Sequence, residues 1–443
     1  MGKKTILTSL LWFCFLFLVI LNFVSAFVPE IGFDALWYHL TLPKLWLLKK
    51  QWYFSGGLLY YSTMPRLTEI IFIPLISLLG YIGPKLLQFI SGLSVCYLLS
   101  QIAKQHGFNQ KWRLIAINLF YLTWLVSWQS SSGYIDLFRT LLETIALYNI
   151  LNKHRYLGAV FLGLAIGTKW LSLGSVLIYA FIFGFNLLPI SLVIALPWFL
   201  IAFFLTHNPI YPIFSSYLPH QNLNVLTIFQ NILLLPAKIT LPFDDFISPV
   251  AGLLVSLSAI NYLFEKDNLL KKVSLLAVFG AIFSVVLNPP SSRFFLPFLP
   301  AAAIGASALV IKSPVIIKKL STWLFLISFL IILCMRIYAF KKNLPFLLGH
   351  LSVNQYLSSL SLRLPGTFID SDDYVRNNLQ GQKILIDTIH NLYYFPYNFD
   401  HTSWITDQTG YDYLVTSHSD PQSINGQLVH TNSVGIQIYK LNK

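Results

Sequence analysis

Residues 5–27 read TILTSLLWFCFLFLVILNFVSAF, and residues 28–40 continue as VPEIGFDALWYHL. The first run follows Lys3 and Lys4 and carries no charge. Its length matches the ~20 residues that a helix needs to cross a bilayer. A removable signal peptide is the alternative, but the length favours a retained first span that starts in the cytoplasm. Asp34 therefore stands among aromatic residues just beyond a membrane crossing.

The whole chain has the composition of a multi-spanning membrane protein. Of its 443 residues, 56% are hydrophobic and only 11% are charged, which excludes ordinary soluble domains and excludes disorder. The net charge of +13 would suggest nucleic-acid binding in a soluble domain. Here the collection of Lys and Arg at cytoplasmic ends of spans explains it, so no nucleic-acid partner is expected. The three cysteines lie in apolar runs and are interpreted as packing residues.

The positions of Lys and Arg also predict the topology. Residues 28–66 should form an outer loop in the membrane interface, because the segment is amphiphilic and rich in Trp and Tyr. The apolar stretches 67–81 and 86–103 count as one net crossing, since the basic loop 104–113 should stay inside. Either the first stretch is re-entrant or interfacial, or the two form one broken helix.

The later spans alternate consistently with the charges. They are predicted at about residues 114–128, 137–151, 156–167, 171–185, 187–205, 273–287, 294–311 and 320–340, with one more between the outer loop 207–248 and residue 265. This gives about eleven net crossings of the cytoplasmic membrane, with the N-terminus inside. The C-terminal region is then outside.

Residues 343–443 differ from the rest in composition and contain no run long enough to span. We therefore divide the chain into a transmembrane domain, residues 1–342, and a small soluble extracytoplasmic α/β domain, residues 343–443. Strands are predicted at residues 384–386, 413–415, 436–439 and, at an edge, 428–431, with helices near 353–362 and 372–379.

On this topology the outer face holds nearly every polar residue that could do chemistry: Asp34, His39, Arg66, Glu69, Asp136, Arg139, Lys169, His207, Asp244, Asp245 and Arg293. Ionisable groups near the bilayer are costly and usually face a cavity or a partner. A transporter would more naturally place them near the midplane. The asymmetry therefore predicts a functional site at the external interface.

Two aspartates are candidate catalytic residues. A carboxylate at Asp34, flanked by apolar and aromatic residues, could have a raised pKa and act as a general base. Asp136 could face it across the site, as an orienting group or a weak metal ligand. The alternative for both is a structural one, because Asp is a common N-cap and each precedes a predicted helix.

Two cations are candidate phosphate contacts. Lys169 interrupts a long apolar segment, where a lysine is expensive unless it snorkels or meets an anion. Arg293 stands at a predicted helix start behind two prolines, where its planar fork suits a phosphate. The alternative for Arg293 is anchoring to lipid headgroups. More weakly, residues 208–212, Asn-Pro-Ile-Tyr-Pro, form a rigid turn that could shape a substrate groove with Tyr211.

Several motifs are absent from the sequence. The chain has no P-loop, no dinucleotide-binding glycine motif, no His-Glu-x-x-His and no Cys-x-x-Cys. ATP-driven transport and zinc chemistry therefore have no support.

Taken together and in order, these segments resemble the multi-spanning glycosyltransferases of the GT-C type, which include the protein mannosyltransferases and the aminoarabinose transferases of lipid A. The Asp-x-x-x-Tyr-His form looks closest to a poorly characterised bacterial branch of that group. The resemblance covers roughly residues 1–311. Its matching pieces are residues 34–40 with 42–44, residues 64–69, 134–136, 167–169 and 208–212, and Arg293 with Pro297 and Pro300.

The resemblance implies that a sugar is transferred, with inversion, from a polyprenyl-phosphate donor to a hydroxyl of a lipid, glycan or protein. Asp34 would deprotonate the acceptor, and Asp136 would orient either the acceptor or the partner of Asp34. The implied substrate-binding residues are His39, Arg66, Glu69, Lys169, Tyr211 and Arg293, with the cations stabilising the lipid phosphate. Ala35 follows Asp34 where protein mannosyltransferases have an acidic pair, which argues against a protein acceptor and leaves a divalent metal weakly supported.

Three alternatives remain beside this expectation. A polysaccharide polymerase or ligase would depend on arginines in a large outer loop, and residues 207–248 contain none. A lipid-linked sugar flippase or transporter would require polar residues on the inner half and pseudo-repeats, which are not apparent. A non-catalytic membrane subunit fits the structural interpretation of each candidate residue.

Overall fold

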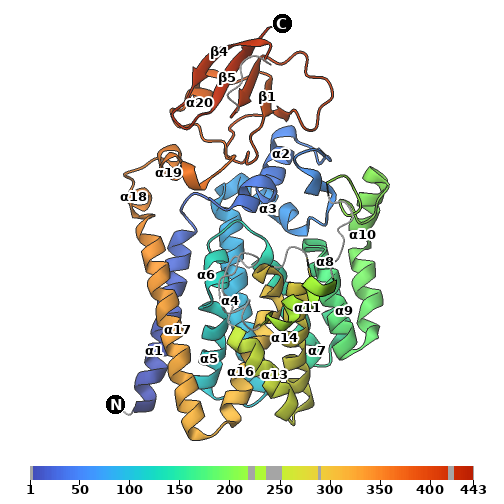
Figure 1. The fold of residues 1–443 in the computed structure, drawn as a ribbon, viewed down its shortest axis with the longest axis vertical. Helices are drawn as coiled ribbons and strands as arrows, with labels where there is room; N and C mark the ends of the chain where they lie inside the picture. Colours follow the sequence, from blue (N-terminus) through green and yellow to red (C-terminus); the bar gives the residue numbers. More distant parts are fainter. Residues whose placement is uncertain (1–2, 218–224, 236–251, 288–290, 418–423, 443) are drawn as a thin grey trace.

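A bundle of helices carries a small sheet domain at one end (Figure 1). The computed structural model describes residues 3–217, 225–235, 252–287, 291–417 and 424–442. Within these ranges six helices are long and apolar enough to cross a membrane, namely Ile6–Ser25, Ile82–Gln105, Phe185–Thr206, Asn268–Val286, Ser292–Lys312 and Val315–Lys341. The chain is therefore an integral membrane protein of mostly helical structure.

The α-helices follow one another from α1 at the N-terminus to α20 beside the sheet. They are α1 (Lys3–Ser25), α2 (Thr41–Lys49), α3 (Leu67–Leu79), α4 (Ile82–Gln105), α5 (Gln110–Tyr121), α6 (Trp124–Gln129), α7 (Asp136–Leu151), α8 (Arg155–Thr168), α9 (Ser172–Phe183), α10 (Leu188–Thr206), α11 (Val225–Leu233), α13 (Gly252–Phe264), α14 (Asn268–Val286), α15 (Ser292–Phe295), α16 (Leu299–Lys312), α17 (Val315–Lys341), α18 (Leu344–Leu347), α19 (Val353–Ser359) and α20 (Tyr374–Asn378). Short π and 3-10 turns are η1 (Ala35–His39), η2 (Tyr60–Thr63), η3 (Phe185–Leu187), η4 (Leu296–Phe298) and η5 (Ser361–Arg363).

The two apolar stretches that precede residue 104 form separate helices. Gly80, at φ +57, ends α3 in a conformation that a side chain would strain, and α4 starts at Ile82. α3 has 13 residues, too few to cross a bilayer, and lies beside α2 at the end of the bundle that carries the sheet domain (Figure 1). The short α3 agrees with one net crossing by the two stretches, whereas its re-entrant or interfacial position stays a prediction. The count of about eleven crossings stays a prediction.

The segment predicted as one span at residues 114–128 is divided into α5 and α6. The chain turns at Thr123, whose hydroxyl accepts a hydrogen bond from the backbone N–H of Val126, at 3.4 Å, and so caps α6. The same hydroxyl donates to the carbonyl of Phe120, at 2.9 Å. This turn leads α6 toward the loop before Asp136, at the domain end of the bundle.

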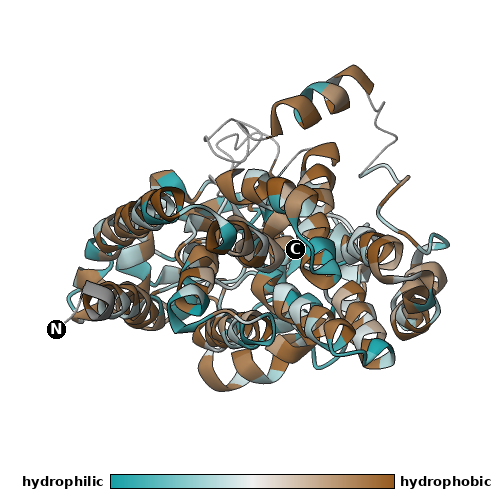
Figure 2. Cartoon of the chain, turned by 90° about the horizontal axis from the view of Figure 1, so that it is seen from below, coloured by the Kyte–Doolittle hydropathy of each residue, from teal (hydrophilic) through white to brown (hydrophobic). Residues whose placement is uncertain are grey.

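Small residues allow the central helices to approach closely. Five alanines of α16 are buried, and a Cβ at Gly305 would come within 2.7 Å of the Ser258 hydroxyl of α13 and 2.8 Å of the Ser274 hydroxyl of α14. Such close contacts are how helices gain packing energy in a membrane, where apolar surface alone does not drive association. Apolar residues cover much of the helices seen from below (Figure 2).

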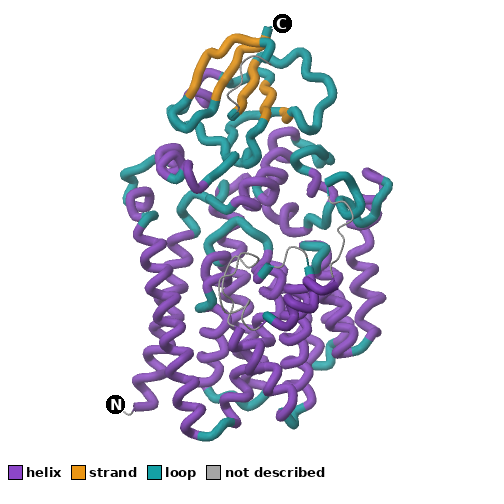
Figure 3. The backbone as a smooth tube through the Cα atoms, viewed as in Figure 1, coloured by secondary structure: helices purple, strands orange, loops and turns teal. Residues whose placement is uncertain are grey.

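The C-terminal region forms a five-stranded mixed sheet in the order β2-β1-β3-β5-β4 (Figure 3). The strands are β1 (Ile384–Asp387), β2 (Asp400–His401), β3 (Tyr413–Thr416), β4 (Gly426–Thr431) and β5 (Gln437–Leu441). β1 pairs in parallel with β2 and β3, whereas β5 is antiparallel to β3 and β4. All four predicted strands and both predicted helices are present, which confirms the α/β class of this region. The boundary at residues 342 and 343 stays a prediction, although α17 does end at Lys341.

The sheet domain is docked on α2 by both apolar and charged contacts. Leu42, Leu45 and Trp46 of α2 share one buried cluster with side chains of the sheet domain such as Ile386. The Lys44 ammonium donates to the carbonyls of Tyr393 and Phe395, at 2.6 and 2.7 Å, and Lys49 pairs with Asp400 at 2.7 Å. Carbonyl contacts of a half-buried lysine tie this end of the domain to the membrane region.

We expect Lys44→Met to loosen the docking of the sheet domain, because the two carbonyls then lose their shared donor while the apolar stem is kept. Hydrogen exchange of residues 391–399 should become faster, and limited proteolysis should cut there sooner. Lys50→Met, at an exposed position just after the same helix, is the matched control. Equal exchange in both variants would contradict the tethering role.

Candidate active site

Asp34 lies in the turn between α1 and α2 and points toward the start of α15. Its Oδ2 accepts a hydrogen bond from Nη1 of Arg293 at 2.5 Å. Although Asp34 occupies the N-cap position of η1, its side chain makes no cap hydrogen bond. The capping interpretation is therefore wrong for this residue, because the ion pair with a guanidinium takes the carboxylate that a cap would need.

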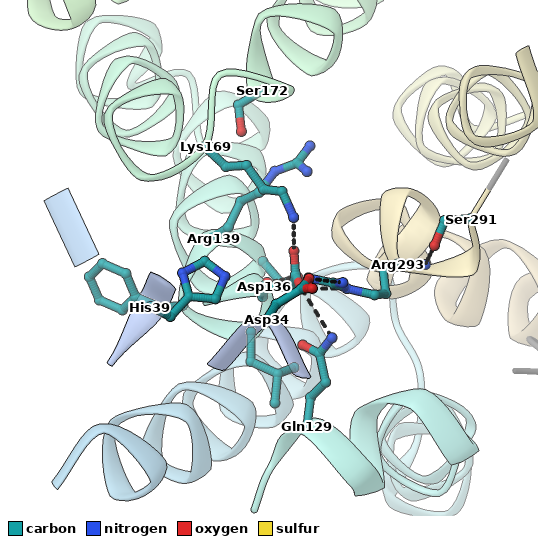
Figure 4. Close-up of polar contacts among 12 residues, drawn as sticks. Asp34, His39, Gln129, Asp136, Arg139, Lys169, Ser172, Ser291 and Arg293 are labelled. Carbon is teal, nitrogen blue, oxygen red and sulfur yellow. Dashed lines mark hydrogen bonds and ion pairs between the residues drawn. The ribbon is translucent and has the colours of Figure 1, made fainter. Parts of the chain in front are cut away.

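Asp136 is the first residue of α7 and is completely buried. Its carboxylate accepts hydrogen bonds from Gln129 Nε2 at 3.1 Å, Lys169 Nζ at 2.8 Å and Arg293 Nε at 3.0 Å (Figure 4). None of these bonds caps α7, so the capping interpretation is wrong here too. Three side chains from other segments instead converge on one carboxylate.

Arg293 joins the two carboxylates. Ser291 caps the short helix α15 through the N–H of Arg293, and the guanidinium then lies with its Cζ 4.5 Å from the ring centroid of Tyr134. Nη2 forms an ion pair with Asp136 Oδ2 at 2.9 Å. It has no hydrogen-bond partner among the described residues. The arginine is thus fixed by two aspartates and an aromatic face, with part of its donor capacity unused.

We call Asp34, Asp136, Lys169 and Arg293 the carboxylate cluster. Two carboxylates and two cations make its formal charge zero. Burial alone would raise the pKa of Asp34, but Arg293 outweighs that effect and holds the pKa below its ordinary value of 3.8. The raised pKa expected for Asp34 is therefore wrong for this arrangement, because an arginine distant in sequence compensates the apolar surroundings.

Two buried polar side chains outside the carboxylate cluster, Glu30 and Gln88, position the segments that carry Asp34 and Asp136. Glu30 accepts the N–H groups of Ile31 and Gly32 at 3.0 and 2.7 Å with one oxygen, and the N–H of Gly133 with the other. It thereby ties the turn that bears Asp34 to the loop before Asp136. Gln88 of α4 accepts the N–H groups of Leu137 and Phe138, both at 3.1 Å, and so satisfies backbone donors at the buried start of α7 that have no partner within the helix.

Sequence reasoning missed Glu30, Gln88 and Gln129. Gln88 is an amide within an otherwise apolar span, and that anomaly is a signal that could have been noticed. Glu30 precedes the Asp34 segment, but nothing nearby in the sequence suggested a backbone-binding role. Gln129 was assigned to a polar outer loop, whereas it ends α6 with its side chain buried.

His39, Arg66 and Glu69 form a second buried group, which we call the histidine cluster. His39 Nδ1 is 2.6 Å and Arg66 Nη1 is 2.9 Å from the same oxygen, Glu69 Oε1. Burial lowers the pKa of His39, although the Glu69 carboxylate opposes this effect. Several polar atoms here have no partner among the described residues: His39 Nε2, Glu69 Oε2, and Nε and Nη2 of Arg66. Unsatisfied buried donors and acceptors mark a place where a polar ligand would be stabilised.

The remaining candidates have no hydrogen bond or ion pair with the side chains of either cluster among the described residues, although Arg139 lies close to Lys169 and Asp136 (Figure 4). Tyr211 packs its ring against Phe54, with ring centroids 5.8 Å apart, and lines a narrow hollow with Pro65 and Trp170. Arg139 pairs with Glu143 at 2.9 Å within α7. Asp244 and Asp245 fall outside the described residues.

No group of three or more His, Cys, Asp or Glu side chains could hold a metal ion in the part of the chain that the structure describes. The weak expectation of a divalent metal stays a prediction.

The fold of the chain can be compared with known structures. The chain is similar to two crystal structures of ArnT from Cupriavidus metallidurans, one bound to undecaprenyl phosphate and one in the apo state. The TM-scores are 0.64 and 0.62, the sequence identities are 13% and 14%, and the alignments cover 98% and 99% of this chain and 98% of each ArnT chain. No protein-family model and no curated protein sequence matches the chain. The likeness therefore establishes the fold alone.

We expect Asp34→Asn to lower thermal stability at pH 7 and to have progressively less effect as the pH falls below 3.8. The pKa of Asp34 is lowered in the folded protein, so its ion pair stabilises above the unfolded value and is lost as pH falls through the folded value. Melting temperatures of both proteins in detergent, compared at each pH, provide the measurement. A difference that stays constant down to the most acidic condition would show that the ion pair does not stabilise the fold.

Proposed function

We propose that the protein is an inverting glycosyltransferase that moves a sugar from a polyprenyl-phosphate donor to a hydroxyl acceptor. One observation carries the proposal: the chain brings two carboxylates and two cations together from four distant segments, within a fold like that of ArnT bound to undecaprenyl phosphate. Carboxylates and cations at one point are what such a reaction needs, because a proton must leave the acceptor while negative charge develops on the departing phosphate.

In the proposed reaction Asp34 Oδ takes the proton of the acceptor hydroxyl. The resulting oxygen attacks C1 of the sugar on the face opposite the phosphate. The bond from C1 to the phosphate oxygen breaks, and the polyprenyl phosphate leaves with the bonding electron pair. The new glycosidic bond has the inverted configuration, and the proton on Asp34 is later lost to solvent.

Asp34 is a weak base in the resting arrangement, since Arg293 stabilises its ionised form. An arriving donor phosphate would compete for the same guanidinium and would add negative charge nearby. Both effects raise the pKa of Asp34 and so strengthen it as a base when the substrate is present. The unused Nη2 donor of Arg293 gives the phosphate a first point of contact.

Lys169 and Arg293 are proposed to stabilise the charge on the leaving phosphate, with Arg66 as a third cation. Asp136 holds Lys169 and Arg293 in place by direct ion pairs and orients the reacting groups. The Nε and Nη2 donors of Arg66, unpaired in the described part of the chain, suit an anion, while Glu69 fixes that side chain and His39. Tyr211 is proposed to line the groove that admits the donor.

We propose that the reaction takes place at the outer face of the cytoplasmic membrane. Asp34 shortly precedes α2, which packs against the sheet domain, and the charge bias of the loops assigns that end of the bundle to the outside. Residues 343–443 would then be an extracytoplasmic domain.

We expect Asp34→Asn to reduce turnover by about 100-fold or more, because it removes the general base and keeps the side-chain shape. The assay uses purified protein in nanodiscs with a panel of polyprenyl-phosphate sugars, and measures release of polyprenyl phosphate. Asp373→Asn, an exposed carboxylate in the sheet domain, is the matched control and should retain activity. Near-normal turnover of Asp34→Asn would exclude Asp34 as the base. Donor binding without turnover in the wild type would instead support a flippase or a non-catalytic subunit.

Lys169→Met and Arg293→Lys should each raise the KM for the donor by about 10- to 100-fold and leave the KM for the acceptor unchanged. The magnitude follows from about 1.5–3 kcal/mol for a hydrogen bond to a charged group. Initial-rate kinetics with each substrate varied in turn separates the two constants. Lys104→Met, an exposed lysine near the end of α4, controls for loss of charge. Unchanged donor kinetics in both variants would rule out the phosphate role.

A further inference from the structure

A separate cavity of about 670 Å³ lies between the ends of α1 and α17, the helix α6 and the first segments of the sheet domain. α1 and α17 pack side by side at one edge of the bundle (Figure 1). The cavity is lined by both apolar and basic side chains, among them Trp128, Met335, Arg336 and Lys342. It contains none of the residues of the carboxylate and histidine clusters.

Arg336 is the main reason to expect a ligand in this cavity. Its side chain belongs to the apolar helix α17, and the residue is 9% exposed. Nη2 donates to Asn22 Oδ1 at 2.9 Å and to Ser131 Oγ at 3.1 Å, both of which are uncharged. Among the described residues no carboxylate pairs with this guanidinium, and its Nε has no hydrogen-bond partner. A buried cation with only neutral partners in a membrane protein is costly, and an anion would offset that cost.

The other charges around the cavity have the same sign. Lys85 is buried and donates only to the carbonyl of Val28, at 2.6 Å, while Lys342 and Arg363 are exposed at the rim. In the part of the chain that the structure describes, the one lining carboxylate is Glu30, whose two oxygens already accept backbone N–H groups. Four cations therefore line the cavity with a single carboxylate that already accepts backbone hydrogen bonds, so the cavity favours a negatively charged group.

The apolar part of the lining indicates an amphiphile rather than a small ion. Trp124, Trp128 and Leu360 contribute to the walls. Met335 is 46% and Tyr338 is 67% exposed on the side of α17, which continues as a largely apolar, outward-facing helix. Acyl chains could lie along that surface while the charged head stays beside Arg336.

We propose that this cavity binds the anionic, phosphate-bearing headgroup of a membrane lipid, with Arg336 as the principal contact. The site is distinct from the proposed donor-phosphate site, because the loop before α7 separates them. Ser131 of that loop bonds Arg336, whereas Tyr134 packs on Arg293. The inference goes beyond the proposed function and does not depend on sugar transfer.

The test measures lipid binding by the whole protein reconstituted in phosphatidylcholine nanodiscs that contain fluorescent phosphatidylglycerol. Arg336→Gln should weaken binding of phosphatidylglycerol by about tenfold or more and leave fluorescent phosphatidylcholine unaffected. Lys319→Gln, the same loss of charge at the opposite end of α17, is the matched control and should bind like the wild type. Equal losses in both variants would show only a general effect of net charge and would overturn the site.

A double variant and a competition experiment test the site further. If Arg336→Gln does not fold, the double variant Lys342→Gln with Arg363→Gln, both exposed, should weaken phosphatidylglycerol binding, and an unchanged affinity would count against the site. Soluble glycerol phosphate should compete poorly, because it lacks acyl chains to place along α17. Competition by glycerol phosphate as strong as that by phosphatidylglycerol would show a site for a free anion and would overturn the assignment to a lipid.

Discussion

The Arg293 guanidinium pairs with two carboxylates from separate parts of the chain. Asp34 follows the first helix and Asp136 begins α7, and one cation stabilises both of them side by side. Burying ions is expensive, and removal of one partner from such a group leaves an uncompensated charge. Lys169 adds the second cation, which makes the cluster neutral. That neutrality explains why the resting site has an ordered geometry and little excess positive charge for a phosphate.

The supports around the cluster differ from it in chemistry. Gln88 and Gln129 are neutral amides, and Glu30 spends both oxygens on backbone N–H groups. None of them competes for Arg293. The two loops can therefore be held by hydrogen bonds of fixed geometry while the charged side chains remain able to exchange one partner for another. The histidine cluster is built in the opposite way, since several of its donors and acceptors have no partner within the described ranges.

The membrane class, the strands of the sheet domain and the common face of the charged residues could all be predicted from hydropathy, alternation and loop charge. The pairing within the site could not. Both aspartates precede helices, and local rules assign such residues to caps. The observed partner of Asp34 is Arg293, which is 259 residues away along the chain, and only the packed bundle brings the two together. For the same reason the pKa of Asp34 moved opposite to expectation, because its aromatic neighbours are visible in the sequence and its counter-ion is not. β2, with two residues, is too short to leave a periodic signal.

The order in which the chain is made gives the position of Arg293 a further meaning. During synthesis the segments bearing Asp34, Asp136 and Lys169 enter the membrane well before residue 293. Until the helix pair α15 and α16 arrives, two aspartates share a single lysine and one negative charge lies uncompensated near the bilayer. The hydrogen bonds of the site are therefore complete only once the segment that bears Arg293 has joined the bundle. Formation of the site therefore depends on completion of the bundle. A chain that stops before residue 293 would contain both aspartates but not the guanidinium that pairs with them.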